Sequence, residues 1–125
     1  MSVVVNQYIV YGFSSEYDDM KRLLEEVFDS EALREQFEDD YHDNGYRHAI
    51  TRADKLTLIM DGMNGDYAYL GVILEKAECG HMVESFTPAM TKCSARDKRA
   101  LMALPLAQAL ARTQRPTIHL VTHYH

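Results

Sequence analysis

The chain has 125 residues, a length that suits one domain with a single core, and 46% of its residues are apolar, which favours a folded globule over a disordered tail. Its apolar runs fall well short of the ~20 residues that a membrane-spanning helix needs, so the sequence excludes a membrane-spanning protein. The net charge of −6 conceals an uneven distribution of charge along the chain.

The N-terminal part predicts a strand followed by a helix. Residues 3–13 (VVVNQYIVYGF) are β-branched and aromatic and are apolar on both faces, as in an interior strand. Ser14 or Ser15 is the expected N-cap of the helix that follows. The apolar positions at helical spacing are Tyr17, Met20, Leu23, Leu24, Val27 and Phe28. A further helical pattern, with Leu33, Phe37 and Tyr41 spaced four apart, continues that helix or restarts it near Ser30, and "HDNG" at residues 42–45 ends it.

The second half predicts a hairpin, a helix and a last strand. Residues 55–61 and 66–76 are two strands around "GMNG", in which Asn64-Gly65 suits the positive φ of a hairpin loop. Residues 77–93 are irregular. Ser94 with Asp97 opens a helix that reaches about Thr113, and Pro105 either kinks it or restarts it. Residues 117–125 (TIHLVTHYH) alternate as a strand.

The order β-α-β-β-α-β predicts a single α+β domain over residues 1–125, most simply a ferredoxin-like two-layer sandwich. Right-handed crossovers place the first and third strands in the centre of the sheet and the last strand at an edge beside the first. We expect that edge strand to pack Ile118 and Leu120 against the helices and to leave its histidine face in water.

Acidic residues concentrate in residues 16–43, which hold twelve of them against three basic residues. This density argues against contact between the segment and nucleic acid, because such contacts need clustered Lys and Arg. It favours a partner protein with a basic surface, although a merely solvated helix face is the alternative. The candidate partner-binding residues are Glu25, Glu26, Glu31, Glu35, Glu38, Asp39 and Asp40.

The C-terminal histidines raise the alternative of a metal site. In a strand, His123 and His125 share a face and could hold zinc together, whereas His119 is roughly 13 Å from His123 at the rise of a strand. The third ligand would come from elsewhere in the chain. Its candidates are Cys79 and His81, and further Cys93, His42 and His48. Because none of these spacings matches a standard zinc module, the leading expectation is no cofactor, with histidines on a solvated strand.

Motifs that define common enzymes are missing. "DGMNG" joins two strands and is a hairpin turn, unlike the G-x-x-G loop that joins two helices in KH domains. The sequence contains no Walker A loop, no G-x-G-x-x-G and no G-x-S-x-G. A nucleophilic role for Cys79 or Cys93 is disfavoured, since buried thiols are commoner than reactive ones. We therefore expect a protein that is not an enzyme. Two cysteines and the lack of an apolar leader favour a reducing, cytoplasmic location.

Two stretches, "YIVYGF" near the start and "LIMDGMNGDYAYLGVILEK" in the middle, resemble a group of small, uncharacterised tailed-bacteriophage proteins. The likeness rests on strand and turn residues. It implies an accessory protein in an infected bacterial cytoplasm that modulates or inhibits a host protein. The chain departs from that group in its acidic stretch and histidine-rich end, so no site is carried over.

Three functions remain open. The first is a non-enzymatic binding protein that engages a host protein through the acidic helical face, with nucleic-acid mimicry as one mode. The second is a metal-binding domain or metal-dependent enzyme that uses His123, His125 and either Cys79 or His81. The third is a homodimeric module that pairs through an exposed sheet face. Tyr8, Tyr67 and Tyr69 are candidates for that face.

Overall fold

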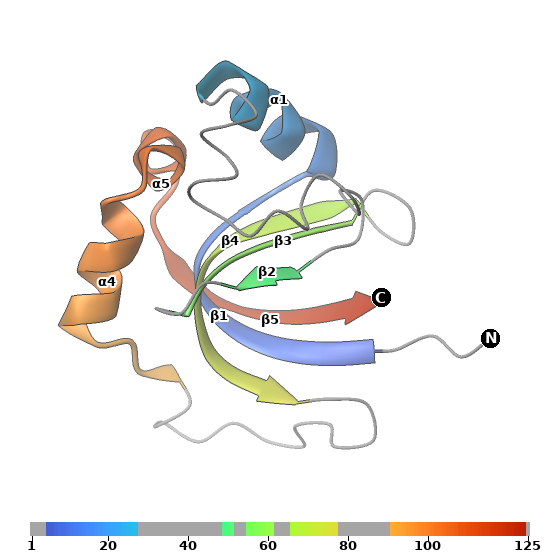
Figure 1. Ribbon diagram of the computed structural model, residues 1–125, viewed down its shortest axis with the longest axis vertical. Helices are drawn as coiled ribbons and strands as arrows, with labels where there is room; N and C mark the ends of the chain where they lie inside the picture. Colours follow the sequence, from blue (N-terminus) through green and yellow to red (C-terminus); the bar gives the residue numbers. More distant parts are fainter. Residues whose placement is uncertain (1–4, 28–48, 52–54, 62–65, 78–90, 125) are drawn as a thin grey trace.

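The computed structural model describes residues 5–27, 49–51, 55–61, 66–77 and 91–124. These residues form one sheet and three helices (Figure 1). The elements in chain order are β1 (Val5–Ser15), α1 (Tyr17–Val27), β2 (Ala49–Thr51), β3 (Leu56–Asp61), β4 (Tyr67–Ala77), α4 (Ala95–Met102), α5 (Pro105–Leu110) and β5 (Thr117–Tyr124).

The sheet is antiparallel throughout, with the order β2-β3-β4-β1-β5. The α+β class predicted from the sequence is confirmed. The predicted hairpin is β3–β4, with Asp61 opposite Tyr67, and the last strand lies at an edge beside the first, as expected. The three-residue β2 was not predicted. The expected helical pattern around Leu33 and Phe37 and the irregular segment before residue 91 lie largely outside the described residues.

A pair of glycines allows the sheet to bend sharply (Figure 1). Gly12 of β1 lies opposite Gly71 of β4. A Cβ added to Gly12 would collide with the carbonyl oxygen of Leu70 and come within 2.6 Å of the Gly71 Cα, and one added to Gly71 would come within 2.6 Å of Val10 Cγ1. Near this crossing the register shifts, because Ile9 faces Glu75 whereas Val10 faces Ile73. Leu74 is thus the extra residue of a β-bulge, a device that increases local bending.

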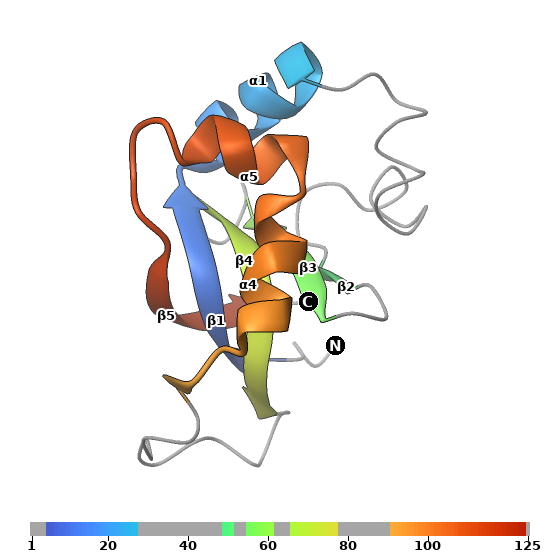
Figure 2. The same cartoon turned by 90° about the vertical axis from the view of Figure 1, so that its left-hand side faces the viewer.

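The helices cover one face of the sheet and enclose the larger core (Figure 2). Each helix contributes apolar side chains to this core: Met20 and Leu24 from α1, Leu101 from α4, and Leu106 and Leu110 from α5. They pack against the sheet through its alternate residues, which are Phe13, Leu56, Leu58, Met60, Ala68, Leu70 and Val72. Burial of so many large side chains is the main force that holds the layers together.

The other face of the sheet carries a second, smaller cluster. Tyr8, Val10, Ile59 and Val121 are buried there, and Tyr69 packs against them half-buried. This corrects one expectation, because the side of β5 that carries His119 and Val121 is not simply in water. Register explains the burial, since Val121 lies opposite Tyr8 and so joins the Tyr8 face.

The expectation that Ile118 and Leu120 pack against the helices is wrong. They lie on the same face as Tyr11 and Ile9, which is the helix side of the sheet, but they are 37% and 49% exposed. The edge strand therefore carries its exposed apolar side chains where they were expected to be covered. The described helices do not bury these two residues.

The helix ends are set partly by local and partly by distant residues. Ser94 caps α4 by accepting a 3.1 Å hydrogen bond from Asp97 N, as predicted, and Pro105 restarts the chain as α5. Neither Ser14 nor Ser15 caps α1, because β1 runs to Ser15. Among the described residues, no helix has the length and apolarity needed to cross a membrane.

Candidate functional site

A groove of about 430 Å³ lies between α1 and α5. It is lined by Ser14, Ser15, Asp19, Arg22, Leu23, Glu26, Ala109, Leu110, Thr113 and Gln114. Along α1 the lining residues recur three and four positions apart, so they form one stripe beside the core-facing stripe of Met20 and Leu24. The groove is therefore a product of the way in which α1 sits against α5.

Gln114 fixes one end of the groove. Its side-chain amide donates from Nε2 to Ser14 O at 2.8 Å, and its Oε1 accepts from Ser14 N at 3.1 Å. The pairing of β1 with β5 stops at Gly12 opposite Thr117. The amide of Gln114 thus replaces the next residue of a neighbouring strand and satisfies two backbone groups of β1. It ties the chain that follows α5 to the strand that leads into α1.

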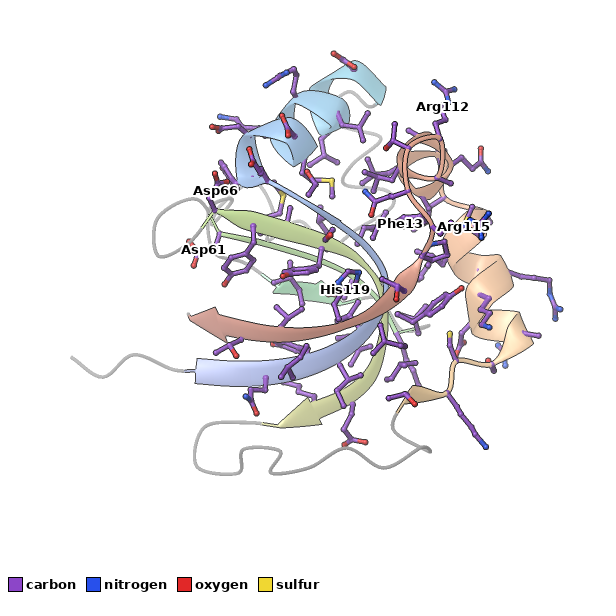
Figure 3. All side chains as sticks on the ribbon, turned by 180° about the vertical axis from the view of Figure 1, so that it is seen from behind. Phe13, Asp61, Asp66, Arg112, Arg115 and His119 are labelled. Carbon is purple, nitrogen blue, oxygen red and sulfur yellow. The ribbon has the colours of Figure 1, made fainter. Side chains whose placement is uncertain are left out.

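Asp66 fixes α1 from the other side. Its Oδ1 accepts a 2.8 Å hydrogen bond from Tyr17 N, the first residue of the helix, and Figure 3 shows Asp66 beside the start of α1. A carboxylate at this position satisfies a free N–H and complements the positive end of the helix dipole. Asp66 directly precedes the hairpin strand β4, so this hydrogen bond ties the start of α1 to the sheet.

The charges on the groove are two carboxylates and one guanidinium. Arg22 Nη2 lies 3.4 Å from Asp19 Oδ1, and both side chains are more than half exposed, at 67% and 60%. An exposed pair of this kind contributes at most ~1 kcal/mol, so either partner can exchange it for another contact. Glu26 is also exposed. Between these charges lie the apolar groups of Leu23, Ala109 and Leu110.

This arrangement suits a long basic side chain. The methylenes of a lysine or arginine can lie along an apolar surface while the charged group reaches a carboxylate at the rim. The groove lining includes no cysteine and no histidine, so the described residues offer no thiol or imidazole nucleophile or base there.

The predicted partner-binding residues fall mostly beyond the described part of the chain. Glu25 and Glu26 belong to α1, and Glu26 lines the groove. The rest of the predicted set lies outside the described residues: Glu31, Glu35, Glu38, Asp39 and Asp40. The groove therefore joins the acidic segment at its N-terminal end.

The predicted metal ligands are not brought together among the described residues. His123 belongs to β5, where its backbone lies opposite Asn6, while Cys79, His81 and His125 lie outside the described residues. Within the described ranges, no three His, Cys, Asp or Glu side chains are grouped so as to hold a metal ion.

Cys93, a further candidate ligand, has a half-buried thiol that is not in a disulfide. Burial raises the pKa of this thiol, and the negative charge of Asp97 raises it further, while Lys98 and Lys55 act in the opposite direction. A raised pKa disfavours the thiolate, which is the reactive and metal-binding form. Whether Cys93 acts as a nucleophile is not tested by this shift, and the expectation that it does not stays a prediction.

Of the three tyrosines proposed for a dimer surface, Tyr67 and Tyr69 form an aromatic row with His119. Tyr8 is buried, and the rings of Tyr67 and Tyr69 lie 5.7 Å apart. The Tyr69 ring is in turn 5.3 Å from that of His119, whose Nε2 is 3.2 Å from Gly12 O. The Tyr67 hydroxyl can donate to Thr122 O at 3.3 Å. Tyr67 and Tyr69 are half-buried, and pairing through this face stays a prediction.

Two residues of the site were missed by sequence reasoning. Gln114 lies in a short connection between a helix and a strand, and Asp66 was expected to be only the first residue of a hairpin strand. Each acts on a partner far away in the sequence, at 100 and 49 positions. No local pattern signals such a contact. Comparison with protein-family models, curated proteins and solved structures finds no match for this chain.

Proposed function

We propose that the chain is a non-enzymatic binding protein that takes a basic segment of a partner protein against α1 and the groove between α1 and α5. The observation that carries the proposal is the groove itself, which sets the carboxylates of Asp19 and Glu26 beside an apolar lining. A lysine or arginine of the partner places its stem on Leu23 and Leu110 and its charge at the rim.

The acidic segment as a whole adds negative charge to that of the groove. Its twelve acidic residues between positions 16 and 43 attract a basic partner at long range, and the groove supplies the short-range contact. In this proposal Glu31, Glu35, Glu38, Asp39 and Asp40 act mainly on the rate of association. Such charge density also permits mimicry of a nucleic-acid backbone.

The setting of the proposal is an infected bacterial cytoplasm. It rests on the resemblance of the strand and turn stretches to small tailed-bacteriophage proteins. The partner is then a host protein with a basic surface, which the chain modulates or inhibits. We also propose that the four longer strands and the helices form a ferredoxin-like sandwich, for which the order β3-β4-β1-β5 is the support.

The test uses two double variants with equal changes of charge. Asp19→Asn with Glu26→Gln removes the carboxylates of the groove, and Glu16→Gln with Asp18→Asn removes two exposed carboxylates of the same region that do not line it. Binding of an oligo-lysine peptide is measured by calorimetry. We expect the groove variant to lose roughly tenfold or more in affinity, a loss that corresponds to about 1.4 kcal/mol.

The control variant should lose much less than the groove variant. Equal losses would show that only the overall charge matters and would overturn the groove as the site. A second arm captures partners from a bacterial lysate with the wild type and both variants. A captured protein that the groove variant retains at full yield would contradict the proposal.

A second candidate function, self-association, is favoured by one observation. β5 is an edge strand of eight residues that exposes Ile118 and Leu120. Edge strands of this length can pair with another chain through their unpaired backbone groups. We propose pairing of two copies along β5 in place of the tyrosine face, because Tyr8 is buried.

A further inference from the structure

Five basic side chains gather at and beside α4, away from the groove. Lys55, Lys92, Arg96, Lys98 and Arg99 are all exposed, and we name this set the α4 basic surface. The segment from residue 91 to residue 104 contains one acidic residue, Asp97. Among the described residues, none of the five forms an ion pair. A chain with more acidic than basic residues thus keeps five unneutralised cations in one region.

The chain brings these residues together from two places. Arg96 and Arg99 are three positions apart in α4 and so share a helix face, and Lys92 lies in the segment just before the N-cap Ser94. Lys98 lies with its Nζ 5.2 Å from the centre of the Tyr11 ring. Lys55 precedes β3, and both Lys55 and Lys98 lie close enough to the Cys93 thiol to oppose the rise in its pKa. The five cations therefore share one end of the helical layer.

Lys55 has an unusual backbone. Its φ is 69°, and it is the one residue other than glycine with positive φ among the described residues. This conformation is unfavourable for a residue with a Cβ, and asparagine or glycine adopts it more easily. It is held in place because Lys55 O accepts a 3.0 Å hydrogen bond from Ile73 N. A lysine at a position that favours asparagine or glycine indicates that the side chain itself has a role.

We propose that the α4 basic surface binds the phosphodiester backbone of a nucleic acid. Exposed Lys and Arg neutralise phosphates and release their counterions, which supplies affinity without a pocket. Two of the five are arginines, which can bind phosphate oxygens through two parallel hydrogen bonds. The half-buried ring of Tyr11 beside Lys98 adds an aromatic surface on which a base can stack.

The acidic residues of α1 do not adjoin this surface. In Figures 1 and 2 the helices follow one another as α1, α5 and α4, so α1 lies at the far end of the layer from α4. Exposed charges are screened within ~8 Å at physiological salt. The surface is distinct from the groove, and this inference does not depend on the proposed function.

The experiment measures fluorescence anisotropy of labelled oligo-dT, oligo-U and duplex DNA of about 20 nucleotides or base pairs at several salt concentrations. Arg96→Ala with Arg99→Ala removes two cations, and alanine preserves the helix. We expect a loss of roughly tenfold in affinity and a salt dependence that is shallower by about 1.4 in log–log slope for single strands. The three probes distinguish single-stranded RNA, single-stranded DNA and duplex as the source of the phosphates.

The matched control is Arg112→Ala with Arg115→Ala. These two arginines are also exposed, but they follow α5 in the chain, whereas Arg96 and Arg99 belong to α4. The control should bind within about twofold of the wild type. Equal losses in both pairs, or a wild type that binds none of the three probes at low salt, would overturn the proposal. So would equal binding of polyglutamate, which would make the ligand an acidic protein.

Lys55→Asn provides a second, independent readout. Asparagine accepts positive φ, so the variant should melt at the same temperature as the wild type or higher while it binds the oligonucleotide more weakly. If the variant keeps full affinity, Lys55 does not contribute to the α4 basic surface, and the role inferred for its side chain from the positive φ is wrong.

Discussion

Single residues decide how closely β1 and β4 can approach. We predict that Gly71→Ala lowers the free energy of unfolding by about 2 kcal/mol or more, because the new methyl meets the Tyr11 carbonyl and Val10 Cγ1 between two paired strands. Urea denaturation measures the change. Ala111→Gly is a suitable reference, since Ala111 is exposed. A Gly71→Ala variant as stable as the wild type would mean that the sheet relaxes without cost.

The hydrogen bonds of Gln114 can be tested by a variant whose stability should depend on pH in a defined direction. Gln114→Glu keeps an acceptor for Ser14 N but places a carboxylate against Ser14 O, where the amide now donates. We expect a loss of about 1–3 kcal/mol at neutral pH.

A protonated carboxyl can donate again, so the folded-state pKa of the new side chain should lie above its unfolded value of about 4.3. The deficit of the Gln114→Glu variant should therefore shrink as pH falls through that raised pKa. Thermal unfolding of variant and wild type across pH measures this. A deficit that does not depend on pH would contradict the hydrogen-bond account.

The rate at which the Cys93 thiol is alkylated should depend on its charged neighbours. Burial and Asp97 raise the pKa of the thiol, and Lys98 lowers it. At about pH 8, near the ordinary pKa of cysteine, Asp97→Asn should therefore speed alkylation of Cys93, and Lys98→Gln should slow it. Mass spectrometry of the peptide that contains Cys93 separates its rate from that of Cys79. Rates that move together in the two variants would rule out charge as the cause.

At the scale of elements, α1 depends on a residue of another element. Asp66→Ala should destabilise α1 by about 1 kcal/mol, because Tyr17 N then lacks its acceptor. Hydrogen exchange of the α1 amides should accelerate more than that of β4. Asp66→Asn is the control, since its amide oxygen can still accept. Equal protection in Asp66→Ala and the wild type would show that packing of Met20 and Leu24 alone holds the helix.

Elements with strong local patterns could be predicted, whereas their ends and contacts could not. The β3–β4 hairpin, the cap at Ser94 and the restart at Pro105 follow from neighbouring residues, and the structure confirms them. β1 was expected to be interior because both of its faces are apolar, and Ile9 and Val10 are indeed buried. Three apolar or β-branched residues such as those of β2 carry too little pattern to be recognised.

The missed features depend on contacts between distant segments. The bend at Gly12 and Gly71 arises only when these two residues become opposite each other, and β-strand alternation gives no sign of it. Burial of Val121 depends on its register opposite Tyr8, and exposure of Leu120 depends on how far the helices cover the other face of the sheet. Half of the groove could be anticipated, because Asp19, Arg22 and Glu26 share a face of a predicted helix. The α5 half could not, since nothing local places Gln114 beside Ser14.

For the whole molecule, the exposed side of β5 predicts the state of association. We expect a dimer at tens of micromolar, paired along β5 where Ile118 and Leu120 are exposed. Leu120→Lys should return the monomer, because a charge on an edge strand opposes pairing. Light scattering measures the mass, and Ala111→Lys, which adds the same charge outside the sheet, is the control. A monomeric wild type would exclude this interface.

The pairing of Val5 with Tyr124 has a mechanical consequence. β1 and β5 are antiparallel, so the first described residue of one strand and the last of the other are direct neighbours at the same end of the sheet. A force that pulls the two ends apart therefore acts across the hydrogen bonds and loads them one pair at a time. Strands loaded in this way separate one hydrogen-bonded pair after another, whereas strands pulled along their length must break many hydrogen bonds at the same time. Stretched by its ends, the molecule should lose β5 first and at low force.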